Sequence, residues 1–98
     1  MTKVFHLMKD KELLGVLHSY ESNFPWLNCK FEATSAFEKF RPLFETELAA
    51  LGADDMTNWE AAHERITELD LNLLNIDENK WIDNFLLHIE DNEAWFRF

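Results

Sequence analysis

The first part of the chain alternates apolar and polar residues in a pattern that predicts an antiparallel hairpin. Residues 4–8 and 13–20 carry this alternation, and Asp10 and Lys11 between them suit a tight turn. Because side chains face one another across paired strands, the turn also predicts a register. The expected pairs are Leu7 with Leu14, Phe5 with Val16, Met8 with Leu13, and Val4 with Leu17.

A third strand is expected after Pro25, which interrupts the pattern because proline has no N–H to donate to a sheet. Alternation resumes from residue 26 to residue 32. Leu27, Cys29 and Phe31 then share one side, with polar residues between them. This pattern is typical of a strand that is buried on one face.

The period changes to a helical one after residue 34. Ser35 and Glu38 match a capping box, in which each side chain satisfies a free backbone N–H. Pro42 conflicts with one continuous helix, because an interior proline costs about 3 kcal/mol. We therefore expect a short helical turn over residues 35–40 and a main helix from near Pro42 to Gly52. The apolar residues of this region are Phe37, Phe40, Phe44, Leu48 and Leu51.

A second helix is predicted from Thr57 to near Asp70. Thr57 and Glu60 match another capping box, and apolar residues recur at helical spacing behind them. Its apolar stripe consists of Trp59, Ala62, His63, Ile66 and Leu69.

The end of the chain predicts a short strand over residues 71–76, a polar turn over 77–80, and a final hairpin. Asp91 and Asn92 suit the tip of that hairpin, where a positive φ is needed. The register then pairs Leu87 with Phe96, Ile89 with Ala94 and Phe85 with Phe98 on one face. Leu86 with Arg97, His88 with Trp95, and Glu90 with Glu93 form the other face.

These elements predict a single α+β domain over residues 1–98 in the order β-β-β-α-α-β-β-β. Strands and helices that come in separate runs favour an antiparallel sheet, here of about five or six strands, with both helices packed on one face. The residues that we expect to be buried are Phe31, Phe37, Phe44, Leu48, Ile66, Leu87 and Phe96.

Composition narrows the classes of function. The 98 residues carry a net charge of −10, which disfavours nucleic acid as a partner, because affinity for phosphates comes mainly from Lys and Arg. No apolar run approaches the length of about 20 residues that spans a membrane. Charged residues near the N-terminus argue against a signal peptide, and a single cysteine excludes an internal disulfide. We therefore expect a cytoplasmic protein that does not act at a membrane.

Three segments resemble a family of small acidic bacterial proteins that is known mainly as uncharacterised open reading frames. They are FPWLNCKFEATSAF (24–37), RPLFETEL (41–48) and FLLHIEDNEAWFRF (85–98), in this order. The resemblance spans most of the chain and implies a bacterial cytosolic protein. It implies no activity, catalytic residue, ligand or cofactor, and Asn92 departs from the glycine expected in such a hairpin.

The residues that could carry chemistry are not arranged in a known motif. His6, His18, His63 and His88 lack the close spacing that zinc ligands show, so we expect no metal site. Cys29 lies among apolar residues, which favours an inert core thiol. With Gly15 and Gly52 as the two glycines, no phosphate-binding loop is present. We expect no cofactor and no catalytic residue.

Glu60, Glu64 and Glu68 form the most organised group of carboxylates, one helical turn apart on one face. Like charges at this spacing oppose helix formation by a few tenths of a kcal/mol each. The simpler interpretation is a solvated face with partial relief from Arg65. The sharper one is a stripe that docks a basic protein partner.

A second candidate surface is the less apolar face of the sheet, which the register assigns to Trp26, Leu86, His88 and Trp95. Tryptophans that are exposed together suit a protein partner, a second subunit or a small ligand. The alternative is that other parts of the chain, such as the segment around Trp81, cover them.

We therefore expect a non-catalytic cytosolic interaction module, immunity-like or inhibitor-like, that binds a basic protein. The alternative is a small-ligand-binding protein or a hydrolytic enzyme that uses His88 or His18 with a carboxylate in a pocket. A homodimer is also expected, because the uncovered sheet face would otherwise leave apolar residues in water. Those residues are Val4, Leu13, Leu17, Leu86 and Trp95.

Overall fold

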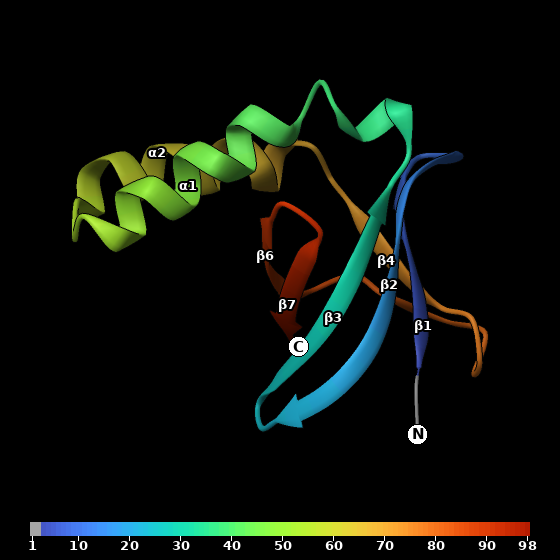
Figure 1. The fold of residues 1–98 in the computed structure, drawn as a ribbon. Helices are drawn as coiled ribbons and strands as arrows, with labels where there is room; N and C mark the ends of the chain where they lie inside the picture. The colour runs from blue at the N-terminus through green and yellow to red at the C-terminus, as the bar shows by residue number, and fades with distance from the viewer. Residues whose placement is uncertain (1–2) are drawn as a thin grey trace.

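The computed structural model describes residues 3–98 as an α+β fold with one antiparallel sheet and two α-helices (Figure 1). The seven strands of the sheet are arranged in the order β5-β4-β1-β2-β3-β7-β6. The elements are β1 (Val4–Lys9), β2 (Glu12–Asn23), β3 (Trp26–Ala33), the 3₁₀ turn η1 (Ser35–Phe37), α1 (Arg41–Gly52), α2 (Met56–Glu68), β4 (Asn72–Asn75), β5 (Lys80–Ile82), β6 (Leu86–Glu90) and β7 (Glu93–Arg97).

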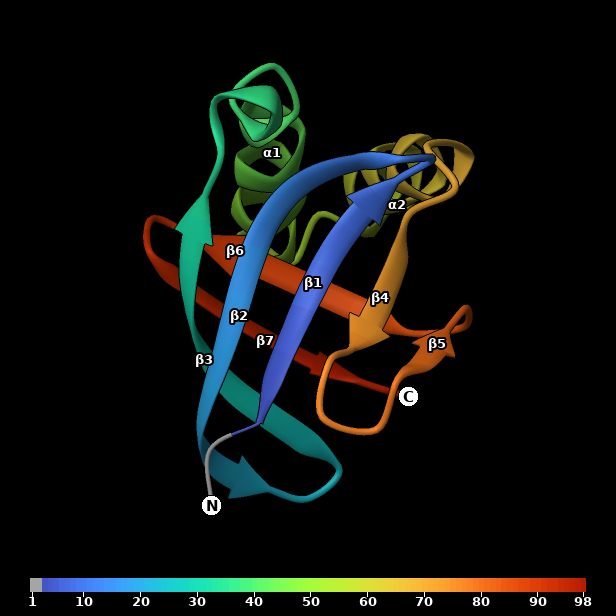
Figure 2. The same ribbon diagram turned by 90° about the vertical axis from the view of Figure 1, so that its right-hand side faces the viewer.

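The sheet curls around the hydrophobic core. β2 and β3 lie between β1 and β7, so in a flat sheet β1 and β7 would be about 14 Å apart. The ring centroids of Phe5 on β1 and Phe96 on β7 are nevertheless only 5.0 Å apart, in an edge-to-face arrangement. The concave side, seen in Figure 2, therefore closes on itself and contains the core.

Aromatic side chains from the helical region close one end of the curled sheet. Phe37 of η1 contacts Phe31 of β3, with ring centroids 5.0 Å apart, and Phe44 of α1 contacts Phe37 at 5.6 Å. All three rings are buried. This stack fixes where the chain leaves β3 and where α1 begins.

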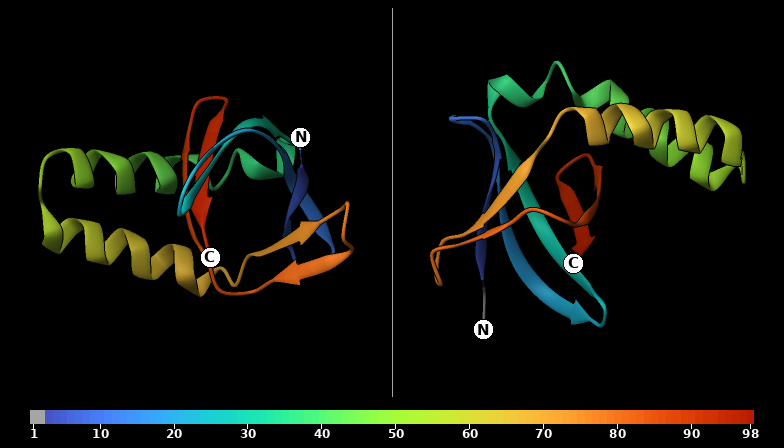
Figure 3. Two further views of the ribbon diagram at one scale, coloured as in Figure 1. Left: turned by 90° about the horizontal axis from the view of Figure 1, so that it is seen from below. Right: turned by 180° about the vertical axis from the view of Figure 1, so that it is seen from behind.

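The two helices form an antiparallel hairpin, residues 41–68, which we call the helical hairpin. Its first helix packs against β6, and the remainder extends away from the sheet (Figures 1 and 3). The prediction that both helices cover one face of the sheet is therefore wrong. Because the sheet curls, its concave face is filled by the sheet's own side chains, and the helices lie at its end.

The final hairpin confirms the predicted register from the pair of Leu86 with Arg97 to the pair of Glu90 with Glu93. The predicted pair of Phe85 with Phe98 lies outside the paired strands, and Phe98 is 73% exposed. Leu87 pairs with Phe96 and Ile89 with Ala94, and all four side chains are buried in the core. Asp91 at the tip has a φ of 53°, as the expected turn requires. The aromatic end of the chain thus belongs to the sheet through Phe96.

The register of the first hairpin differs from the prediction. An irregularity between Leu7 and Met8 shifts the pairing, so that Leu7 faces Gly15 and Phe5 faces Leu17. Only the pair of Met8 with Leu13 is as expected. A β-bulge inserts one extra residue, and alternation alone cannot reveal it. Leu17 consequently belongs to the core and not to the outer face.

The number of strands also exceeds the five or six expected, because four strands follow the helices instead of three. The additional strand is β5, a three-residue element that begins inside the segment predicted as a polar turn. It pairs with β4, where Trp81 faces Leu74. The edge position of this short strand explains why its own sequence carries little strand pattern.

Neither predicted capping box forms. At the first, Thr34 is the N-cap residue without a side-chain cap, and Glu38 binds Arg41 instead. At the second, Asp55 caps α2 by accepting a hydrogen bond from the backbone N–H of Asn58. Aspartate is as good an N-cap as threonine, and its position two residues earlier starts the helix at Met56.

The predicted core is mostly confirmed. Leu48 and Ile66 are half-buried, because the helical hairpin extends beyond the sheet and covers these side chains on fewer sides. The fully buried members of the predicted set are Phe31, Phe37, Phe44, Leu87 and Phe96.

We expect Gly15→Ala to destabilise the fold by about 1–3 kcal/mol, because overpacking displaces well-packed neighbours. A Cβ atom at Gly15 would lie 2.3 Å from Cε1 of the buried Phe31 ring. Gly52→Ala is the control, since no atom lies within 4 Å of its Cβ position and alanine favours the helix. Urea denaturation followed by tryptophan fluorescence measures both; equal stability of the two variants would contradict the close contact.

Candidate functional site

The most constrained polar group in the described residues is the carboxylate of Glu47 on α1. Its side chain is 1% exposed and accepts a hydrogen bond from Nδ1 of His88 on β6, with 2.8 Å between Nδ1 and Oε1. Its other oxygen accepts a hydrogen bond from the indole N–H of Trp59 on α2. Both oxygens are therefore satisfied by donors from different elements.

The local sequence explains how this carboxylate reaches the interior. Glu47 follows Phe44 by three residues and precedes Ala50 by three, and both of these residues are buried, so Glu47 occupies a position on the inner side of α1. A buried charge costs several kcal/mol unless it is paired and hydrogen-bonded. Trp59 can only donate, and it therefore fixes Oε2 as an acceptor. An ionised carboxylate only accepts, so the contact with Oε1 assigns a proton to Nδ1 of His88.

Two tryptophans enclose the imidazole of His88. The centroid of its ring lies 5.6 Å from that of Trp26 on β3 and 5.5 Å from that of Trp95 on β7. The guanidinium of Arg97 lies 5.6 Å from the Trp26 centroid, which is a cation–π distance. Trp26 and Trp95 remain half-buried, whereas the His88 side chain is 5% exposed.

Nε2 of His88 is left with a different environment from Nδ1. No hydrogen-bond partner for it is found among residues 3–98, and no buried side-chain nitrogen or oxygen in this range lacks a partner. Nε2 therefore contacts solvent. A neutral imidazole with a proton on Nδ1 presents an acceptor at Nε2, which is the arrangement in which histidine acts as a general base or binds a donor.

The structure brings together four residues that the sequence assigned to one surface. Trp26, His88 and Trp95 are in ring contact, and Leu86 lies on the same side of β6, opposite Arg97 in the register. Sequence reasoning missed Glu47, although a glutamate within an apolar helical stripe was the available signal. Trp81 faces Leu74 of β4 and is itself 55% exposed.

The acidic stripe, Glu60, Glu64 and Glu68, lies elsewhere. All three side chains are exposed on α2, on a side of the helix that contains neither Trp59, which binds Glu47, nor the buried Ala62. Within residues 3–98 no ion pair involves any of the three, so Arg65 does not give the relief that was expected. The stripe is a concentration of uncompensated charge.

The other histidines have separate environments. His18 contacts Glu32 at 2.6 Å on the exposed outer face of the sheet, and His63 stacks on Trp59 with ring centroids 4.8 Å apart. His63 lines a cavity of about 290 Å³ together with Asp70 and Asp83. His88 does not line this cavity, nor the one between α1 and α2, nor the one beside Glu45 and Ile89.

Neither a metal ion nor a membrane receives support from the described part of the chain. Residues 3–98 contain no group of three histidine, cysteine, aspartate or glutamate side chains that could hold a metal. Neither of their helices has the length and apolar character needed to cross a bilayer.

Comparison of the chain with protein-family models, with curated proteins and with solved structures found no match. The resemblance to small acidic bacterial proteins therefore stays a prediction.

We expect Glu47→Leu to destabilise the protein by about 3 kcal/mol, because it leaves the Trp59 indole N–H and Nδ1 of His88 buried without a partner. The exposed neighbour Glu45→Leu is the control and should change stability by less than about 0.5 kcal/mol. Combining Glu47→Leu with His88→Phe should recover part of the loss, since a polar partner is then removed as well. Urea denaturation measures all three variants, and a Glu47→Leu protein as stable as the Glu45→Leu protein would refute this role.

Cys29 is expected to be unreactive in the folded protein. The side chain is buried on the inner face of β3, and desolvation raises the pKa of the thiol to about 12, with a smaller contribution from the charge of Glu93. The thiolate is the reactive species and is therefore scarce at neutral pH. A thiol-specific chromogenic reagent should label the native protein slowly and label one thiol per chain rapidly in guanidinium chloride. Rapid labelling without denaturant would show that Cys29 is accessible.

Proposed function

We propose that this chain is a non-catalytic interaction module, immunity-like or inhibitor-like, and that the helical hairpin binds a basic protein partner. The observation that carries the proposal is the acidic stripe, which is exposed on α2 and unpaired within residues 3–98. The repulsion within such a stripe is relieved when a cationic surface binds it.

The distribution of charge supports this choice of surface. The helical hairpin contains seven acidic residues and two basic ones, so it holds half of the net charge of −10 within 28 residues. One of the two basic residues, Arg41, is already bound to Glu38. The acidic residues are Glu45, Glu47, Asp54, Asp55, Glu60, Glu64 and Glu68.

The position of the helical hairpin supports it as well. It extends away from the sheet (Figure 3), and the stripe occupies an exposed side of α2 from Glu60 to Glu68, toward the end of the helix that lies nearest the sheet. Clustered surface charge of one sign increases the rate of association with a partner of opposite sign. A location in the bacterial cytosol, which the family resemblance implies, is part of the proposal.

A second candidate function is supported by the solvent contact of Nε2 on His88. With Glu47 behind it and Trp26 and Trp95 beside it, this nitrogen could bind a small donor ligand or act as a general base. Of the three cavities, the one that combines a histidine with carboxylates is lined by His63, Asp70 and Asp83. We rank this candidate second, because a ligand site normally requires a concavity and none of these three cavities includes His88.

The proposed function predicts that neutralising the acidic stripe removes specific partners. Immobilised protein is incubated with bacterial lysate, and the proteins retained by the Glu60→Gln, Glu64→Gln, Glu68→Gln triple variant are compared with those of the parent. The parent should release its basic partners as the salt concentration is raised, because salt screens the attraction between exposed charges. The triple variant should not retain these proteins.

The matched control carries Glu12→Gln, Asp83→Asn and Glu90→Gln, which neutralise three exposed acids outside the helical hairpin and give the same net charge. This variant should retain the same partners as the parent. If both triple variants lose the same proteins, overall charge and not the stripe is responsible. If neither loses any, the proposed function is wrong.

A further inference from the structure

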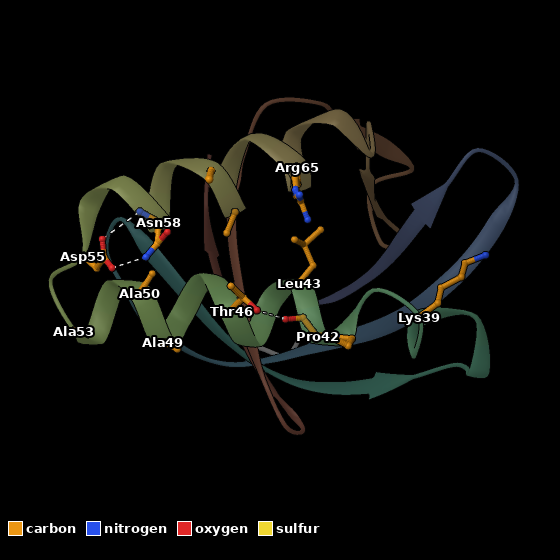
Figure 4. A pocket seen from close by; sticks show the side chains of 12 residues that line it. Lys39, Pro42, Leu43, Thr46, Ala49, Ala50, Ala53, Asp55, Asn58 and Arg65 are labelled. Atoms are coloured by element: carbon orange, nitrogen blue, oxygen red, sulfur yellow. Dashed lines mark hydrogen bonds between the residues drawn. The ribbon is translucent and has the colours of Figure 1, made fainter.

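The largest of the three cavities is a groove between α1 and α2, on the side of the helical hairpin that faces away from the strands (Figure 4). Its volume is about 680 Å³. Five alanines line it, so no large side chain of this chain fills it. The alanines are Ala49, Ala50, Ala53, Ala61 and Ala62.

The charges along this groove are separated by sign. Lys39 and Arg65 line the end nearest the sheet, and Asp55 lines the end at the helix–helix turn, next to Asp54 (Figure 4). Neither Lys39 nor Arg65 takes part in an ion pair within residues 3–98. The groove is therefore positive at one end and negative at the other, with small apolar residues between.

We propose that this groove is the interface of a two-fold homodimer, in which the helical hairpins of two copies pack antiparallel, groove against groove. The two-fold axis crosses the middle of the groove, so each surface is paired with itself. Arg65 of each copy then lies against Asp55 of the other. Small side chains on both sides let the four helices approach closely, as in a four-helix bundle.

Charge selects the antiparallel arrangement. In a parallel pair Arg65 would meet Arg65 and Asp55 would meet Asp55, so both ends would repel. A parallel pair would also bring both sheets to the same end. In the antiparallel pair both ends attract and the sheets lie at opposite ends of the bundle. This self-complementarity is why a second copy fits the groove better than a partner of uniform charge.

The size of the groove predicts a weak dimer. A 12-residue helix is about 18 Å long and two neighbouring helices are about 20 Å wide, so each copy contributes roughly 350–400 Å². The total lies below the roughly 1,200 Å² of a standard stable interface. The dimer is thus reversible and depends on concentration in the micromolar range or above.

This interface differs from both surfaces considered above. The acidic stripe starts at Glu60, whereas the residues of α2 that line the groove are Asn58, Ala61, Ala62 and Arg65. At about 100° per residue, the stripe lies on a different side of α2 and stays outside the interface. The dimer does not rest on the proposed function. The groove also takes the place of the outer sheet face as the surface for self-association. Leu17, one of the apolar residues expected on that face, is buried in the core.

The test is sedimentation velocity on two charge variants, alone and mixed. Arg65→Asp places an acid against Asp55 of the second copy, and Ala53→Lys places a cation against Arg65. Each variant alone should dimerise at least tenfold more weakly than the parent, since the attraction is lost at both symmetric contacts. The equimolar mixture should dimerise more tightly than either variant alone. One contact of the mixed pair keeps Arg65 against Asp55, and at the other the lysine at position 53 offsets the repulsion between the aspartate at position 65 and Asp55.

Two controls separate charge from bulk and net charge. Ala53→Gln adds a side chain of similar length without charge, and Lys11→Asp changes the net charge as Arg65→Asp does, in the exposed β1–β2 turn. Both should dimerise like the parent, and circular dichroism confirms that each variant is folded. A parent that stays monomeric at millimolar concentration overturns the proposal. Dimers that are unaffected by Arg65→Asp, or variants that do not recover on mixing, overturn it equally and indicate another interface.

Discussion

The buried carboxylate of Glu47 is the interaction on which the arrangement of this molecule depends. It lies on α1, and its two hydrogen bonds go to His88 on β6 and to Trp59 on α2. Because a buried carboxylate without both donors would cost several kcal/mol, the three elements have to meet in one relative position. Apolar contacts alone tolerate sliding between helix and strand, whereas two directional hydrogen bonds do not. The carboxylate thus determines which side of the helical hairpin faces the sheet and which sides face solvent.

The parts of the fold that could be predicted from the sequence are those in which one pattern excludes the alternatives. In the final hairpin, a shift of one strand by one residue would turn Leu87 or Phe96 out of the core, so alternation fixes the pairing. That register alone places His88 beside Trp95, and half of the aromatic cluster followed from it. Glu47 was missed because its partners come from segments distant in sequence, and a helical stripe does not say what lies opposite a polar residue.

The parts that could not be predicted depend on single residues that leave the pattern ambiguous. Leu13 and Leu14 are both apolar, so the sequence fits a regular hairpin and a bulged one equally well. The bulge is decided by the tertiary structure, in which Leu14 and Leu17 both reach the core and Gly15 admits the ring of Phe31. Likewise, β5 is a strand because β4 offers an edge, and Trp81 remains 55% exposed there. Local sequence reports neither of these long-range choices.

The three sides of α2 illustrate how one constraint can separate several functions. Trp59 turns one side toward the sheet through Glu47, and this leaves the alanine-lined groove and the acidic stripe on two further sides. If two copies pair through the groove, their stripes remain exposed and are related by the same two-fold axis. A partner with two basic patches would then meet two stripes at fixed spacing, and its second contact would form at a high effective concentration. Weak contacts at each stripe would suffice for stable binding, which suits surface charges whose individual contributions are small.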